Sequence, residues 1–310
     1  MIYRVTRLLL LLALFAPPSL HAGPAVDSLP GFDLPSARPA FTHPKKTRLV
    51  TECEQFSKPV EWGYCLSRTE GSQSTDLLYY LHGKGGNKRG WTDRHNFTAV
   101  IQDRWEGGGK QAPVVVAISF GKFWLLSEKN PSKDSGLLDF IVDYAMPYIE
   151  QKKLGGKIGA RQLIGESMGG FNASQLVLKH PELFSRAALV CPALGSLSPY
   201  DGKQAVEDYI KRTGARRFNV EVVLRLLKAV FPDDASWQTA SPLGIGKTLL
   251  GSKTPPLHVS CGAKDEYGFF EGAQAFATLA RDKGVDTRWE PLSGGHCAAD
   301  PAALAAFLVP

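Results

Sequence analysis

The chain has 310 residues, of which 44% are hydrophobic and 21% are charged, and its formal net charge is +6. This composition is that of a globular protein and excludes a disordered or collagen-like chain. The positive excess is small and no dense Lys/Arg tract carries it, so we do not expect nucleic acid as a partner.

The first 22 residues have the layout of a secretory signal peptide. Arg4 and Arg7 precede an unbroken apolar run at 8–16, and Ala22 is a small residue suited to cleavage. The run is shorter than the roughly 20 residues that a membrane-spanning helix needs, so we expect no stable membrane anchor. The sequence therefore predicts cleavage near Ala22 and a periplasmic or secreted protein. The alternative is an N-terminal anchor that stays uncleaved.

Residues 23–46 are rich in Pro, Ala and Ser and are interpreted as an extended lead-in. The segments at 48–56 and 59–67 then have the pattern of two strands in a hairpin centred on Pro59. Cys53 and Cys65 lie symmetrically about this centre, which would place the two sulfurs opposite each other.

The sequence holds five cysteines, and an exported chain can form disulfides. A Cys53–Cys65 bridge is the predicted pairing, and two buried thiols are the alternative. Because five is odd, at least one cysteine is free or pairs outside the chain. No CxxC pair and no His/Cys cluster of zinc spacing occurs, so we expect no metal site.

After the hairpin, short apolar strand patterns alternate with helical patterns, which is typical of βαβ units and a mainly parallel sheet. We thus expect an α/β fold with a mainly parallel central sheet flanked by helices. One helical face is predicted from apolar residues at helical spacing between 137 and 148, and another is predicted in the helix after Cys261. The strand patterns are at 77–81, 114–119, 162–165, 187–191, 257–261 and 287–292, and the two faces are Leu137, Ile141, Tyr144, Ala145 and Tyr148, then Phe269, Ala273, Phe276 and Ala280.

The interval 192–255 breaks this alternation and holds two predicted helices, at 204–212 and 220–231. We interpret it as a cap-like insertion over the carboxyl edge of the sheet, where open α/β sheets bind ligands. GIGKT at 244–248 looks like part of a phosphate-binding loop, but that motif requires Gly at 241, where Ser241 stands. We therefore expect no phosphate site there.

The strongest chemical signal is GESMG at 165–169, which follows a predicted strand and opens a predicted helix. A G-x-S-x-G motif in this context is the nucleophile elbow, in which a serine projects from a sharp turn. The glycines allow the chain to cross itself closely. Ser167 is the predicted nucleophile. The alternative is a glycine-rich helix entry with an unreactive serine.

A second glycine-rich loop, at 82–86, follows the strand pattern at 77–81. In elbow enzymes this loop supplies one oxyanion-hole amide and the residue after the nucleophile supplies the other. The predicted donors are therefore the N–H groups of Lys84 and Met168. His82 is expected to orient this loop by hydrogen bonding and not to act as the base.

Two further residues follow the ends of later strands, Asp265 and His296. Such hydrolases carry their triad in the order Ser, acid, His, and Ser167, Asp265 and His296 reproduce that order. In this arrangement the imidazole takes the serine proton and the carboxylate orients the imidazole. Glu266, the neighbour of Asp265, is the alternative acid.

These segments together resemble the α/β-hydrolase superfamily and, within it, the esterase group that includes esterase D, feruloyl and acetyl-xylan esterases and the antigen 85 mycolyltransferases. The resemblance extends from about residue 47 to the C-terminus. It rests on LHGKGG at 81–86, GESMGG at 165–170, GAKDEYG at 262–268 and GGH at 294–296.

The resemblance implies one hydrolase domain at 47–310 with Ser167, Asp265 and His296 as nucleophile, acid and base. It also implies that the Lys84 and Met168 amides form the oxyanion hole. Residues 120–135 and 192–250 match no single subfamily, so the resemblance does not identify the ester.

The sequence thus predicts a secreted or periplasmic serine esterase that needs no cofactor and acts on a small-molecule or polysaccharide-linked ester. An acyltransferase, a thioesterase or a serine peptidase with the same triad remains an alternative, as does a non-catalytic ligand-binding protein. Aromatic residues near strand ends, Trp124 and Tyr267 among them, either line an apolar substrate pocket or pack the cap onto the sheet. The oligomeric state has no sequence signal.

Overall fold

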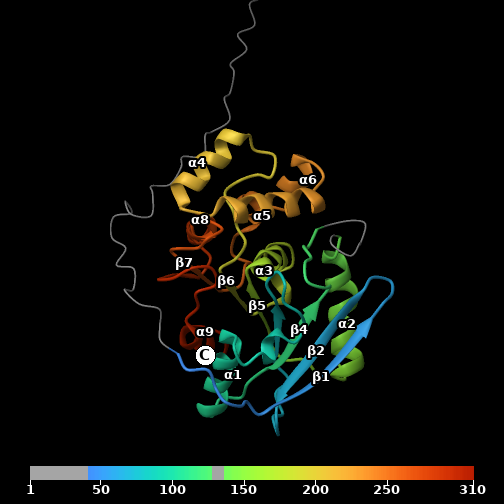
Figure 1. Ribbon diagram of the computed structural model, residues 1–310. Helices are drawn as coiled ribbons and strands as arrows, with labels where there is room; N and C mark the ends of the chain where they lie inside the picture. The colour runs from blue at the N-terminus through green and yellow to red at the C-terminus, as the bar shows by residue number, and fades with distance from the viewer. Residues whose placement is uncertain (1–40, 128–135) are drawn as a thin grey trace, which may run out of the picture.

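The computed structural model describes residues 41–127 and 136–310, so the predicted signal peptide at 1–22 lies outside the described residues. In the described part, eight strands form one sheet in the order β1-β2-β4-β3-β5-β6-β7-β8 (Figure 1). β2 pairs antiparallel with β1 and with β4, and the strands from β4 to β8 are parallel. The mainly parallel sheet is therefore confirmed. The strands are β1 Leu49–Phe56, β2 Trp62–Thr69, β3 Leu77–Leu81, β4 Val114–Ser119, β5 Arg161–Glu166, β6 Arg186–Val190, β7 Leu257–Gly262 and β8 Thr287–Leu292.

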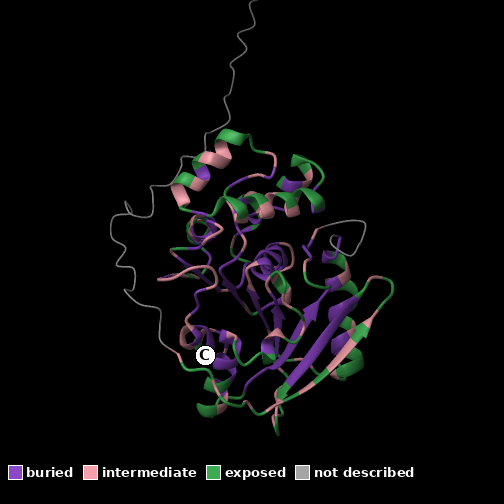
Figure 2. Cartoon of the chain, viewed as in Figure 1, coloured by how far each residue is buried: buried purple, intermediate pink, exposed green. Residues whose placement is uncertain are grey.

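Helices flank this sheet. Every residue of β3, β4 and β7 is buried, as expected for parallel strands that are covered on both faces. Figure 2 shows the inner strands of the sheet as the buried centre of the molecule. No helix in the described ranges is both long and apolar enough to span a membrane. The helices are α1 Phe97–Gly107, α2 Met146–Tyr148, α3 Met168–Lys179, α4 Lys203–Thr213, α5 Arg217–Val230, α6 Asp234–Gln238, α7 Pro242–Leu249, α8 Phe269–Asp282 and α9 Pro301–Leu308, with 3₁₀ turns η2 Gly90–Thr92 and η5 Pro181–Leu183 and π-helices η3 Phe140–Ala145 and η4 Ile149–Lys153.

The hairpin has the predicted register. Cys53 lies directly opposite Cys65, and the two form the predicted disulfide. A second disulfide, Cys191–Cys297, was not predicted, and Cys261 is a buried free thiol.

The helical segment before β5 differs from the predicted α-helix. Two π-helical stretches, η3 and η4, lie on either side of α2. In a π-helix each N–H bonds to the carbonyl five residues back, so a turn holds more residues than in an α-helix. From Ile141 on, the most deeply buried positions recur every fourth residue, at Ile141, Ala145 and Ile149, after the buried pair Leu137 and Leu138, and Tyr144 is 44% exposed. The prediction that Tyr144 lies on the buried face was wrong for this reason.

Residues 192–255 contain α4, α5, α6 and α7, of which α4 and α5 correspond to the predicted helices. Figure 1 shows α4, α5 and α6 gathered at one end of the molecule, near α8. α7 instead packs against α3 and α8 beside the sheet, and the GIGKT segment lies inside it. Helical backbone at these positions does not form the phosphate-cradling loop that the motif would need.

Candidate active site

Ser167 lies in the sharp turn between β5 and α3, with φ 52° and ψ −114°. This conformation is costly for a residue with a side chain and persists only where the surroundings enforce it. The turn needs glycines on both sides. A Cβ on Gly165 would lie 2.1 Å from the carbonyl oxygen of Gly169, and a Cβ on Gly169 would lie 1.9 Å from that of Leu81. The serine is thus held in the predicted strand–turn–helix geometry.

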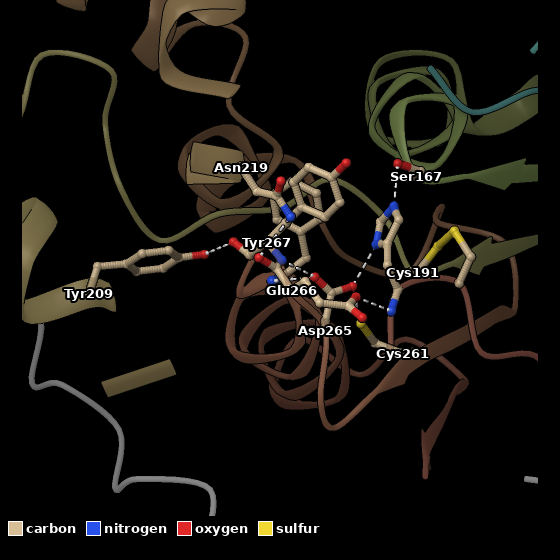
Figure 3. Close-up of polar contacts among 11 residues, drawn as sticks. Ser167, Cys191, Tyr209, Asn219, Cys261, Asp265, Glu266 and Tyr267 are labelled. Carbon is tan, nitrogen blue, oxygen red and sulfur yellow. Dashed lines mark hydrogen bonds and ion pairs between the residues drawn. A yellow bond between two sulfur atoms is a disulfide. The ribbon is translucent and has the colours of Figure 1, made fainter. Parts of the chain in front are cut away.

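The imidazole of His296 connects Ser167 to Asp265 (Figure 3). Nε2 lies 2.8 Å from Ser167 Oγ, and Nδ1 lies 2.6 Å from Asp265 Oδ2. The Asp265 side chain is buried, and its Oδ1 accepts the backbone N–H of Tyr267 at 2.9 Å. A carboxylate can only accept, so Nδ1 carries a proton and Nε2 faces the serine hydroxyl.

Glu266 bonds the backbone of His296 and not its ring. Its Oε2 accepts the His296 N–H at 2.8 Å, and this bond lowers the pKa of Glu266. The Glu266 carbonyl accepts the Arg216 N–H at 2.9 Å and the Asn219 side-chain amide of α5 at 3.2 Å. Glu266 therefore joins the His296 loop to α5, while Asp265 contacts the imidazole.

The glycine-rich loop after β3 passes beside the serine. A Cβ on Gly83 would lie 3.5 Å from the Cβ of Ser167. The Gly83 N–H donates to Glu166 Oε1 at 3.4 Å and is therefore occupied. The N–H groups of Lys84 and Met168, which are the predicted oxyanion donors, have no hydrogen-bond partner in the described part of the chain.

His82 holds this loop in place. It is buried, and burial lowers the pKa of its imidazole. Its Nε2 lies 3.3 Å from Trp124 Nε1 and its Nδ1 lies 2.8 Å from the Gly83 carbonyl oxygen. Because an indole N–H can only donate, Nε2 accepts and Nδ1–H donates to Gly83. This is the orienting contact expected for His82.

The two residues predicted at the substrate pocket have different surroundings. The Trp124 side chain has no exposed surface, and its ring packs 5.1 Å from that of Phe120. This favours the packing interpretation for Trp124. The ring of Tyr267, in contrast, lies 4.6 Å from the ring of His296, measured between centroids.

The Cys191–Cys297 disulfide lies directly beside the triad residues. Cys297 follows His296, and Cys191 follows Val190, whose carbonyl accepts the Ser167 N–H at 2.9 Å. Within the described ranges, the non-glycine residues with positive φ are Ser167, Cys191 and Cys297. The two sulfurs and His296 also form the one group of metal-binding spacing there, but the sulfurs are bonded to each other and offer no thiolate. The bond therefore links the His296 loop to the end of β6, whose last residue is hydrogen-bonded to Ser167.

Comparisons with known proteins identify a family for the chain. The family model described as "Putative esterase" matches residues 59–296. Among solved structures, the chain is similar to a ferulic acid esterase, with TM-score 0.60, 17% identity, and coverage of 86% of this chain and 97% of that one. It is also similar to brefeldin A esterase, described as a bacterial homologue of human hormone-sensitive lipase. The TM-score is 0.58, the identity is 21%, and the match covers 92% of this chain and 81% of that one.

A third similar structure is carboxyl esterase 2 of the mycorrhizal fungus Tuber melanosporum, with TM-score 0.58, 14% identity and coverage of 92% of both chains. No curated protein matches the chain. At these identities the solved structures establish the α/β-hydrolase fold, and the family match identifies the activity. The chain belongs to the "Putative esterase" family of α/β-hydrolases and is a carboxylic ester hydrolase.

Proposed function

We propose that this esterase is a serine hydrolase in which Ser167 is the nucleophile, His296 the general base and Asp265 the acid that orients the base. One observation carries the proposal. The His296 ring lies within hydrogen-bond distance of Ser167 Oγ, at 2.8 Å, and of the buried Asp265 carboxylate, at 2.6 Å, at the same time. A nucleophile bonded to a base that is in turn oriented by a third group is the arrangement that activates a serine.

The proposed reaction has two steps. In the first, Ser167 Oγ bonds to the ester carbonyl carbon while His296 Nε2 takes the serine proton, and Asp265 stabilises the imidazolium. The N–H groups of Lys84 and Met168 donate to the oxyanion of the tetrahedral intermediate. The ester C–O bond then breaks, His296 returns the proton to the leaving alcohol, and an acyl-enzyme remains.

In the second step, His296 deprotonates a water molecule that attacks the acyl carbon. The bond from that carbon to Ser167 breaks, the serine regains its proton and the carboxylic acid leaves. The chemistry is complete with these side chains and water. An alcohol that competes with water at this step would make the same site an acyltransferase, so product analysis with added alcohol separates the two activities.

Labelling with a fluorophosphonate, followed by peptide mass spectrometry, tests the proposal. One label per chain should appear on the peptide that contains Ser167, and Ser167→Ala should remove it. Ser196→Ala changes an exposed serine outside the site and is the matched control, which should label like the wild type. Unchanged labelling and ester hydrolysis in a folded Ser167→Ala variant would refute the assignment.

We also propose that residues 1–22 are removed on export and that the mature protein lies in the periplasm or outside the cell. In it, residues 47–310 form the hydrolase domain and residues 192–255 form its cap. Two disulfides support a compartment in which cysteines are oxidised. The intact mass of protein from a periplasmic extract should correspond to a chain that begins at or near Gly23. Full-length, reduced protein recovered only from the cytoplasm would contradict export.

A further inference from the structure

The residue before the proposed nucleophile, Glu166, makes contacts that the two reaction steps do not use. Its Oε1 accepts two hydrogen bonds, from the Tyr80 hydroxyl at 2.6 Å and from the Gly83 N–H at 3.4 Å. Glu166 is the last residue of β5, whereas Tyr80 belongs to β3 and Gly83 to the loop that follows β3. One carboxyl oxygen therefore joins the strand that leads into the nucleophile turn to the loop of a proposed oxyanion donor.

The peptide group between Gly83 and Lys84 carries the N–H that the proposed reaction directs at the oxyanion. Its carbonyl oxygen accepts His82 Nδ1–H at 2.8 Å and the Gly86 N–H at 3.0 Å. A peptide group is planar, so these two bonds also fix the direction of the Lys84 N–H. Both of these donors belong to the loop itself. The bond from the Gly83 N–H to Glu166 Oε1 is different, because it connects the loop to the nucleophile turn.

The shorter of the two bonds to Glu166 comes from a hydroxyl that is itself held in place. The Tyr80 ring is buried and lies 5.5 Å from the ring of Trp91, measured between centroids. Its hydroxyl oxygen accepts the Asn96 side-chain amide at 3.4 Å. Because the amide donates in that contact, the one hydroxyl proton is left for Glu166. Tyr80 therefore holds the carboxyl group against the loop.

The charge of Glu166 matters because its neighbour Ser167 is the proposed site of a tetrahedral oxyanion. A carboxylate beside the oxyanion would repel it, and a neutral carboxyl group would not. Burial raises the pKa of Glu166, which favours the neutral form. A neutral carboxyl group still has an oxygen that accepts from Tyr80 and Gly83. The contacts thus need an acceptor at this position and do not need a negative charge.

We propose that Glu166 is a positioning residue for the oxyanion hole, which holds the loop of Lys84 against the nucleophile turn through Tyr80 and Gly83. The inference rests on the proposed function, because it takes Ser167 as nucleophile and the Lys84 N–H as oxyanion donor. Removing the acceptor should displace this N–H. The oxyanion exists only after Ser167 has attacked, so the change should weaken binding of the transition state and of its analogues.

Substitutions of Glu166 and Tyr80 test the role of the acceptor. Glu166→Ala should lower kcat/KM for 4-nitrophenyl acetate by about 10- to 100-fold, less than the loss of a whole oxyanion donor. Glu166→Gln keeps an acceptor oxygen and should stay within about threefold of the wild type. Tyr80→Phe should cost less than Glu166→Ala and add little to it, because both remove the same contact. If the alanine variant does not fold, Glu166→Met keeps the length with only a weak acceptor and replaces it.

A second measurement separates positioning from loss of folded protein. An alkyl trifluoromethyl ketone forms a tetrahedral adduct with an active serine and places an oxyanion in the hole. Its Ki should rise by the same factor by which kcat/KM falls in each variant. A sample that merely contains less folded protein would lose kcat and keep the Ki of the ketone.

A second pair of Tyr and Glu provides the matched control. Glu150 Oε1 accepts the hydroxyl of Tyr79 at 2.8 Å, and both residues are buried. Tyr79 precedes Tyr80 on β3, and successive side chains of a strand point to opposite faces of the sheet. Tyr79→Phe and Glu150→Ala should lower the free energy of unfolding, while kcat/KM of the folded fraction and the Ki of the ketone stay unchanged.

The outcomes distinguish a failure of this inference from a failure of the proposed function. The positioning role is wrong if folded Glu166→Ala keeps the wild-type kcat/KM and Ki, or if Glu166→Gln loses as much as Glu166→Ala. It is also wrong if Tyr79→Phe raises the Ki as much as Tyr80→Phe. In each of these cases an inactive Ser167→Ala leaves the proposed function standing. If folded Ser167→Ala hydrolyses the ester like the wild type, the proposed function and this inference are both wrong.

Discussion

The Cys191–Cys297 disulfide is the contact that most directly tests how the site is held together. Replacing both cysteines by alanine removes a bond between residues 106 positions apart, for which a chain-entropy model gives about 4.7 kcal/mol. Cys53–Cys65 joins residues 12 positions apart, and the same model gives about 3 kcal/mol for its loss. Replacing Cys191 and Cys297 should therefore lower the free energy of unfolding by more than replacing Cys53 and Cys65.

The two disulfides should differ more strongly in their effect on catalysis. Cys191–Cys297 connects the loop of His296 to the end of β6, which is hydrogen-bonded to Ser167. A displacement of about 1 Å between reacting groups costs about 100-fold in rate. We expect Cys191→Ala/Cys297→Ala to lower kcat by about 10- to 100-fold. Cys53–Cys65 lies in the hairpin at the far edge of the sheet, so its loss should leave kcat nearly unchanged.

The assay combines urea unfolding, followed by circular dichroism, with the hydrolysis of 4-nitrophenyl acetate. Since the total stability of a domain is about 5–15 kcal/mol, kcat must be normalised to the folded fraction of each variant. Equal losses of kcat in the two double variants, or an unchanged kcat in folded Cys191→Ala/Cys297→Ala, would refute the argument that this bond positions His296.

Further predictions concern the triad and its supports. Ser167→Ala and His296→Ala should each lower kcat by several orders of magnitude, and the double variant should be little worse, because the residues act as one unit. Asp265→Asn should cost about 10⁴-fold in kcat, and Glu266→Gln far less because its amide oxygen still accepts the His296 N–H. A general base must be unprotonated to accept the serine proton, so kcat/KM should rise with pH, and a flat profile would argue against His296 as base. The lowered pKa of Glu266 implies stabilisation that is present above the usual Glu range and lost as pH falls through the lowered value, so Glu266→Gln should weaken the acid dependence of urea unfolding. Gly169→Ala should fail to give folded protein, because its Cβ would lie 1.9 Å from a backbone oxygen.

The sequence by itself predicted the features that depend on local pattern. Runs of apolar residues and the alternation of strand and helix patterns indicated the sheet, because a strand inside a parallel sheet must be apolar on both faces. The elbow around Ser167 was recognisable because the crossing of the chain excludes a Cβ at Gly165 and Gly169, whatever the rest of the chain does. The Cys53–Cys65 pairing was predicted from the symmetry of the two cysteines about Pro59 in a chain with an export signal, and the structure chose it over the alternative of two buried thiols.

Tertiary structure decided what depends on contacts between distant segments. Asp265 and Glu266 are adjacent carboxylates, and only the packing of the His296 loop assigns one to the imidazole and the other to the backbone. The pairing of Cys191 with Cys297 has no local pattern, because their proximity arises where the chain after β6 meets the chain after β8. The π-helical turns before β5 likewise depend on what the helix packs against. The spacing of apolar residues predicts which face of a helix can be buried, but the segments that bury it come from elsewhere in the chain.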